Sequence, residues 1–241
     1  MKFKISYLMY LFLIIMLLSG LFKETIALLI IIFIHELGHI IVIKLLKYPI
    51  SSITIYPFIG IIKINKKINT KIIHDVLISL GGIINQLGFF IMLYLIKKNL
   101  SIYFYQLLFS YNLKMLLFNI IPVYPLDGLK LVNSLLNYLF SYQRSYVISI
   151  TLNIAIIIVI LLIKPSYFIY LFSTYSIIYL FKYYQFNLKV FYLERLYFDY
   201  YYKKIKYLKK PNKNCIKREY KYFYQKGCLI YDESYIITKK D

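Results

Sequence analysis

The sequence predicts an all-α, polytopic membrane protein with about six transmembrane helices, and three observations lead to this class. Hydrophobic residues make up 61% of the 241 positions, against roughly 45–50% in a soluble domain. Several charge-poor runs approach or exceed the ~20 residues that cross a bilayer as a helix. Lysines separate these runs or crowd the C-terminal segment. The formal net charge of +20 is therefore assigned to membrane topology and to anionic lipid as a partner, and nucleic acid is not expected.

The apolar runs place six helices at about residues 5–22, 25–46, 72–96, 101–118, 146–163 and 166–185. The first run could pass for a signal peptide, but no small-residue cleavage site follows, so we expect a retained helix. Lysine and arginine favour alternate connecting segments, which places both termini in the cytoplasm of a multi-pass protein of the cell membrane. The chain then divides into a membrane-embedded domain, 1–185, and a basic cytoplasmic tail, 186–241.

The segment between the second and third expected spans has a different character. Residues 51–63 are too few and too β-branched for a spanning helix, and Pro57 and Gly60 separate two strand-like pieces. This pattern predicts a short membrane-associated β-hairpin, with an interfacial loop as the alternative. A hairpin that dips into the membrane must have its edges covered by protein.

The second expected span contains the motif His35-Glu36-Leu37-Gly38-His39 within a run of apolar residues. On a helix, His35 and His39 share one face, about one turn apart. Two imidazoles so placed can bind one zinc ion, and Glu36 can accept a proton from a water molecule on that ion. The alternative is a chance motif around a satisfied core histidine. Burying two histidines and a carboxylate in hydrocarbon without a metal is costly, so the zinc site is preferred.

A catalytic zinc ion usually has three protein ligands and a water molecule, so a third ligand is expected. Glu24 is assigned to the outer side, His74 and Asp75 to the cytoplasmic mouth of the third span, and six acids to the tail. Asp127 alone lies among apolar segments and away from the motif helix, after two helix-breaking prolines. The alternative for Asp127 is a loop aspartate that caps a helix starting near Leu129.

The two motifs together resemble a known family. His-Glu-Leu-Gly-His in the second span, with Asn-Ile-Ile-Pro-Val-Tyr-Pro-Leu-Asp-Gly at residues 119–128, is similar to the site-2 proteases, which are intramembrane zinc metalloproteases. The similarity is greatest to the six-span branch typified by stage IV sporulation protein FB, and it extends over about residues 1–185. It implies that His35, His39 and Asp127 ligate one zinc ion per chain and that Glu36 is the general base.

The resemblance also implies a function. We expect a zinc metalloendopeptidase that cleaves a membrane-associated or transmembrane protein near the cytoplasmic face, such as a pro-sigma-factor precursor in sporulation or signalling. Inhibitory membrane proteins are expected as further partners. The residues alone leave two alternatives open. One is a membrane-anchored zinc peptidase with a cytosolic active site, and the other is a non-proteolytic zinc-binding scaffold or carrier.

The chain departs from the family pattern at two places. The family carries Gly-Pro-x-x-Asn in its third core helix, where this chain has Gly81-Gly82-Ile83-Ile84-Asn85. Asn85 matches, so the resemblance implies that it positions the substrate; an interhelical hydrogen bond is the alternative. The glycines, with Gly88, also predict close helix packing. The family's Asp-Gly-Gly becomes Asp-Gly-Leu at Leu129. Both departures leave the expected metal ligands intact.

The tail matches the family least well. Sporulation-type members end in a nucleotide-sensing CBS domain, and residues 186–241 are short for a complete one. Residues 193–210 suggest a basic, aromatic surface helix, followed by a segment rich in lysine and tyrosine. A solvated tail attracted to anionic lipid is the preferred interpretation. Contact with a cytoplasmic domain of the substrate is the alternative.

Overall fold

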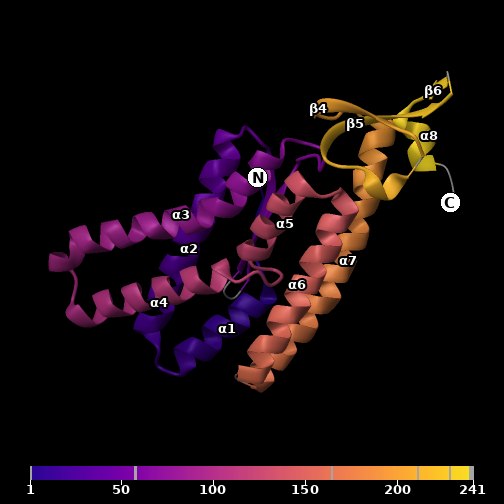
Figure 1. Ribbon diagram of the computed structural model, residues 1–241. Helices are drawn as coiled ribbons and strands as arrows, with labels where there is room; N and C mark the ends of the chain where they lie inside the picture. Colours follow the sequence, from indigo (N-terminus) through magenta and orange to yellow (C-terminus); the bar gives the residue numbers. More distant parts are fainter. Residues whose placement is uncertain (1, 57–58, 164, 211, 228, 239–241) are drawn as a thin grey trace. The chain divides into compact units, whose positions relative to one another are not determined.

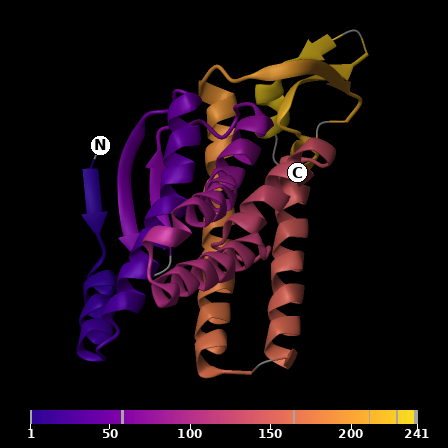
Figure 2. The same cartoon turned by 90° about the vertical axis from the view of Figure 1, so that its left-hand side faces the viewer.

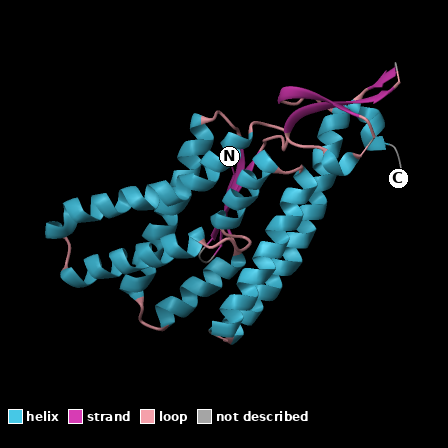
Figure 3. Cartoon of the chain, in the orientation of Figure 1, coloured by secondary structure: helices cyan, strands magenta, loops and turns pink. Residues whose placement is uncertain are grey.

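The computed structural model describes residues 2–56, 59–163, 165–210, 212–227 and 229–238. Helices dominate these described residues, which also form two three-stranded sheets (Figure 3). The expected all-α class is therefore corrected to a mainly helical fold with two small sheets. The chain forms two compact units, Met1–Lys66 with Leu77–Ile120 and Lys67–Val76 with Ile121–Asp241.

The first unit is built on apolar helices. It contains α1 (Tyr7–Leu18), α2 (Phe22–Leu45), most of α3 (Ile72–Ile96) and α4 (Ile102–Ile120), with the short turn η1 (Lys97–Asn99) joining α3 to α4 (Figure 1). Apolar residues spaced by four positions give each helix one packing face. These faces meet in a core of buried side chains from α2, α3 and α4: Ala27, Ile31, Phe89, Leu93 and Leu108.

Glycines let α2 and α3 approach closely. A Cβ atom added to Gly81 would lie 2.8 Å from the main-chain oxygen of Gly38, closer than side chains normally allow. The prediction of close packing is thus confirmed for Gly81. Gly88 differs, because a Cβ atom there would meet nothing within 4 Å.

Within the described part of the chain, three helices are long and apolar enough to cross a membrane: Phe22–Leu45, Ile72–Asn99 and Tyr142–Ile163. They correspond to three of the six expected spans. The first expected span is not reproduced, since α1 has only 12 residues where a spanning helix needs about 17–25. Helices α4 and α7 (Tyr167–Tyr197) occupy the two remaining expected positions.

The expected hairpin is present. Strands β2 (Ile50–Tyr56) and β3 (Ile59–Ile64) pair antiparallel, and β1 (Lys2–Ile5) adds to β2 in parallel. Figure 2 shows these strands side by side. Isoleucine and threonine favour this pleated arrangement because their branched side chains pack well on a sheet. Gly60 pairs with Ile55, whereas Pro57 lies outside the described residues.

The second unit contains α5 (Asp127–Leu139), α6 (Tyr142–Ile163) and α7. Helices α6 and α7 lie side by side in both views (Figures 1 and 2). Beyond α7 follow β4 (Tyr202–Leu208), the turn η2 (Lys213–Cys215), β5 (Glu219–Lys226), β6 (Leu229–Tyr231) and the short helix α8 (Glu233–Thr238). Strand β4 pairs parallel with β5, and β5 pairs antiparallel with β6.

The C-terminal segment therefore folds, and the expected surface helix over 193–210 is wrong. Helix α7 ends at Tyr197, and Tyr202–Leu208 is a strand. Tyr222 of β5 packs in a buried core that also contains Tyr142, Phe191 and Ile236. Aromatic residues are favoured on the half-buried face of a strand. Their packing explains why the segment forms a sheet and not the expected surface helix. Attraction to anionic lipid stays a prediction.

Candidate metal centre

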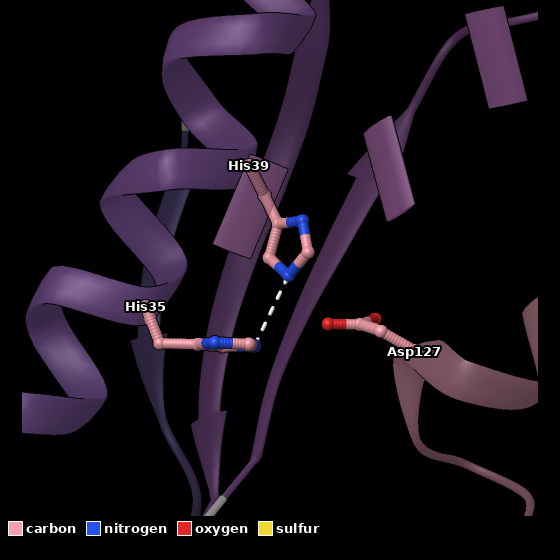
Figure 4. A group of neighbouring side chains, drawn as sticks. All are labelled: His35, His39 and Asp127. Carbon is pink, nitrogen blue, oxygen red and sulfur yellow. Dashed lines mark hydrogen bonds between the residues drawn. The ribbon is translucent and has the colours of Figure 1, made fainter. Parts of the chain in front are cut away.

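The two histidines of the motif project from one face of α2. Both side chains are buried, at 3% exposure for His35 and 8% for His39. Their Nε2 atoms lie 3.2 Å apart, and the rings meet edge to face (Figure 4). Helical spacing places the two residues one above the other, as the sequence predicts. The two Nε2 atoms, which face each other, are thus the nitrogens that can bind one metal ion together.

The other ring nitrogen of each histidine contacts an oxygen atom of α3. Nδ1 of His39 contacts the main-chain oxygen of Ile78 at 2.7 Å, and Nδ1 of His35 contacts Oε1 of Gln86 at 3.2 Å. A carbonyl oxygen only accepts hydrogen bonds, so these contacts favour the tautomer with the proton on Nδ1, which leaves the lone pair of Nε2 for a metal ion.

The spacing of the two Nε2 atoms matches that of two ligands on one metal ion. Ligands at about 2.05 Å from a tetrahedral zinc ion lie about 3.3 Å apart, close to the 3.2 Å between the Nε2 atoms of His35 and His39. A zinc-binding histidine usually donates its other ring N–H to an oxygen acceptor, as Nδ1 can do in both histidines. The histidine pair therefore fits zinc.

Helix α3 shapes this pair through two residues that the sequence analysis did not assign to the site. Gln86 is fully buried and accepts from His35. Gly82 lies one turn earlier, where a Cβ atom would stand 2.5 Å from Cε1 of His35 and 2.7 Å from Nε2 of His39. The glycine at this departure from the family pattern thus leaves room for both imidazoles. The sequence feature that could have indicated this role is a polar side chain, Gln86, four residues after Gly82 in an otherwise apolar span.

Glu36 lies beside the hairpin. Its side chain is buried, and Oε1 accepts a hydrogen bond of 2.8 Å from the main-chain nitrogen of Gly60 on β3. A Cβ atom added to Gly60 would overlap the Glu36 carboxylate. The hairpin therefore supplies a donor for the carboxylate, and glycine is required there because of the close approach.

Asn85 occupies the same helix as Gly82 and Gln86. Its side-chain amide donates to the main-chain oxygen of Ile34 on α2, so it makes the interhelical hydrogen bond that was the alternative role. Positioning of a substrate by Asn85 stays a prediction.

Asp127 lies in the second unit at the first residue of α5 and is 4% exposed. The N-cap position of α5 is Leu126, so Asp127 does not occupy the capping position that the alternative interpretation gave it. Nζ of Lys130 lies 2.9 Å from Oδ1 of Asp127 and orients the carboxylate. Upstream, Oδ1 of Asn153 accepts from the main-chain nitrogen of Tyr124 at 2.8 Å and holds the proline-containing loop.

Among the described residues, one group of histidine, cysteine or acidic side chains has the composition and burial to hold a metal ion, namely His35, His39 and Asp127, which Figure 4 draws. These are the three residues that the sequence motifs select. Imidazole and carboxylate together form a donor set that zinc accepts.

Comparisons with known proteins agree with the motifs. No protein-family model matches the chain. Stage IV sporulation protein FB of Bacillus subtilis (strain 168) is 28% identical over 118 residues, which cover 48% of this chain and 41% of that protein. The site-2 protease from Methanocaldococcus jannaschii shares the fold, with a TM-score of 0.56, 22% identity, and coverage of 76% of this chain and 91% of that one. The predicted resemblance is confirmed, and the chain matches about two fifths of its curated relative's length.

Proposed function

We propose that this chain is an intramembrane zinc metalloendopeptidase with one zinc ion held by His35, His39 and Asp127. The observation that carries the proposal is the histidine pair, with facing Nε2 atoms 3.2 Å apart and both Nδ1 atoms held by α3. The fold shared with a site-2 protease and the partial match to stage IV sporulation protein FB support it. The proposed setting is the cell membrane, with several spans and both termini in the cytoplasm.

Glu36 is the proposed general base. When bound, zinc would lower the pKa of a water molecule to ~7 and polarise the scissile carbonyl. Glu36 takes the proton from the attacking water and returns it to the leaving amine. The main-chain N–H of Gly60 holds Oε1, which orients the carboxylate for both transfers. Burial of Glu36 and the two histidines limits competing water.

The proposed substrate is a membrane-associated or transmembrane protein cut near the cytoplasmic face, of the class of signalling or sporulation precursors. A helical substrate must unwind before its peptide bond can be attacked, because its amides are hydrogen-bonded. Among the described strands β3 pairs only with β2, so an extended segment could add to the edge of β3. Asn85 is proposed to hold the substrate backbone. Substitutions of Pro57 and Gly60 that left cleavage unchanged would count against the added-strand pairing.

The test is co-expression with a pro-sigma-factor precursor, with zinc content measured on the purified protein in parallel. Wild type should cleave, Glu36→Gln should retain zinc and lose cleavage, and Asp127→Ala should lose both. Asp199→Ala, at an exposed aspartate, is the matched control and should behave as wild type. Cleavage by Glu36→Gln would refute the role of the base.

Two further outcomes separate the alternatives. Zinc bound through Asp127 without cleavage of the precursor would support the metal site and overturn the proposed substrate, which leaves the non-proteolytic scaffold or carrier as the alternative. Cleavage that appears only when a second membrane protein is omitted from the host would identify an inhibitory partner, which is part of the same proposal.

A further inference from the structure

Glu219 in the C-terminal sheet bonds to the beginning of α3. It is the first residue of β5, it is buried, and its Oε1 accepts a hydrogen bond of 2.6 Å from the main-chain nitrogen of Ile72. Ile72 is the first residue of α3. Glu219 and Ile72 are separated by 147 positions in the chain, so the contact is entirely a product of the tertiary fold.

A helix needs such a contact at this end. The first four N–H groups of a helix have no partner within it, and the preceding residue, Lys71, carries a side chain that only donates. A carboxylate oxygen satisfies one of these N–H groups and also interacts favourably with the positive end of the helix dipole. Glu219 therefore acts as an N-cap that comes from a distant strand.

The backbone of Glu219 gives an independent indication. Its φ angle is +59°, in the left-handed region that glycine adopts most easily. Gly227, in the turn after β5, shows the usual occupant of such a position at φ +60°. A glutamate in this conformation is explained by its side chain, which the strained backbone directs to α3.

Neighbouring charges hold the same segment. Arg218 bonds to Asp75 through Nη1 at 2.6 Å and donates to the main-chain oxygen of Thr70 at 3.1 Å. Glu194 accepts from the main-chain nitrogens of Ile68 and Asn69, each at 2.9 Å. The approach to α3 and its first turn are thus fixed by buried groups from the C-terminal part of the chain.

Helix α3 then carries this constraint to the histidines. Ile78, which accepts from His39, lies six positions after Ile72, and Gln86, which accepts from His35, lies two turns further along the same helix. A helix is stiff along its axis because each residue is hydrogen-bonded to the next turn. Both imidazole contacts therefore lie on the helix whose first N–H group Glu219 binds.

We propose that Glu219 is a positioning residue for the metal centre, which it influences by capping α3. The proposal rests on the zinc site proposed above. It also gives the C-terminal sheet a role in the membrane-embedded site, in addition to any contact with lipid or substrate.

The test is the zinc dissociation constant of the full chain in detergent, measured by competition with a chelator. Glu219→Gly relaxes the backbone but removes the acceptor. It should weaken zinc binding by about tenfold, because the imidazole partners Ile78 and Gln86 lie on the helix that Glu219 caps and a disturbed outer-shell partner costs about 10- to 100-fold. Glu219→Gln keeps an acceptor oxygen and should stay close to wild type. Lys47→Gly is the matched control, because Lys47 also has φ +59°, and it should leave zinc binding unchanged.

Amide hydrogen exchange of residues 72–76 provides the second measurement, and it should accelerate in Glu219→Gly and not in Lys47→Gly. Should Glu219→Gly fail to fold, Glu219→Asp, which shortens the reach by one methylene, takes its place with the same expectation. Wild-type zinc affinity in the variant without the cap would overturn the proposal. A wild type that binds no zinc would instead overturn the proposed function, and the exchange rates would then decide whether the cap exists.

Discussion

Nδ1 of His35 lies 3.2 Å from Oε1 of Gln86, so a neutral side chain on α3 orients an imidazole on α2. Gln86→Met keeps the length of the side chain and removes the acceptor. We expect the zinc affinity to fall about 10- to 100-fold, because outer-shell partners fix the ring and its proton. The measurement is chelator competition on the purified chain.

The same substitution at Gln106 provides the control, since that glutamine is exposed on α4. Gln106→Met should bind zinc as wild type does. Equal affinities for the two variants would show that the contact between Gln86 and His35 does not orient the ring.

Gly82 leaves the space in which the two imidazoles face each other. A Cβ atom there would lie 2.5 Å from Cε1 of His35 and 2.7 Å from Nε2 of His39, so Gly82→Ala must displace one ring or separate α2 from α3. We expect loss of bound zinc, together with a destabilisation of about 1–3 kcal/mol from overpacking. Metal analysis and thermal unfolding in detergent measure the two effects.

Gly88→Ala tests the same helix without the steric conflict, because a Cβ atom at Gly88 meets nothing within 4 Å. It should keep its zinc and unfold at or slightly above the wild-type temperature, since alanine favours helices. Normal zinc content in Gly82→Ala would mean that the histidines do not share one ion in the observed arrangement.

Local spacing predicts some of this site, and tertiary packing determines the rest. His35 and His39 are four residues apart, so helix geometry alone places them on one face. The hairpin follows from Gly60 and the β-branched residues around it. The bond from Gly60 to Glu36 does not follow, because it joins a strand to a helix whose crossing no local pattern specifies. The contact of Gln86 with His35 could not be predicted either, since an amide in an apolar span can form a hydrogen bond with any neighbouring helix.

The C-terminal segment shows the opposite limit. Its tyrosines and lysines fit a surface helix as well as a strand when only composition is considered. Buried pairing decides for the sheet, in which Tyr222 and Tyr224 face the core while Lys226 remains exposed. The main-chain N–H groups that donate to Glu194 and Glu219 lie more than 120 positions away in the chain. Contacts between residues so far apart cannot be predicted from the pattern of a single sequence.

Gly60 bears on catalysis through Glu36. A Cβ atom at Gly60 would overlap the Glu36 carboxylate, whose atoms are the three nearest to it. We therefore expect Gly60→Ala to retain zinc and to lose cleavage by about 100-fold, the lower range of what a positioned general base contributes. Cleavage of a precursor and zinc content are measured on the same preparation.

Ile61→Ala, at the exposed neighbour on β3, should cleave at nearly the wild-type rate. If Gly60→Ala loses zinc together with activity, the residue supports the metal centre as a whole. Full activity in Gly60→Ala would show that the observed bond to Glu36 is not needed for proton transfer.

Arg195 bonds the end of α7 to the C-terminal sheet, and its removal should unfold that sheet first. Nη1 lies 2.5 Å from Oε1 of Glu233, with side-chain exposures of 0% and 3%, and Nε donates to Oδ1 of Asn69 at 2.8 Å. Arg195→Met leaves a buried carboxylate without its cation, which costs about 3–5 kcal/mol, or roughly 10 °C in the unfolding midpoint of a chain of this size. Arg144→Met, at an exposed arginine, should change the midpoint little, and equal midpoints for both variants would disprove the stabilising role of the pair.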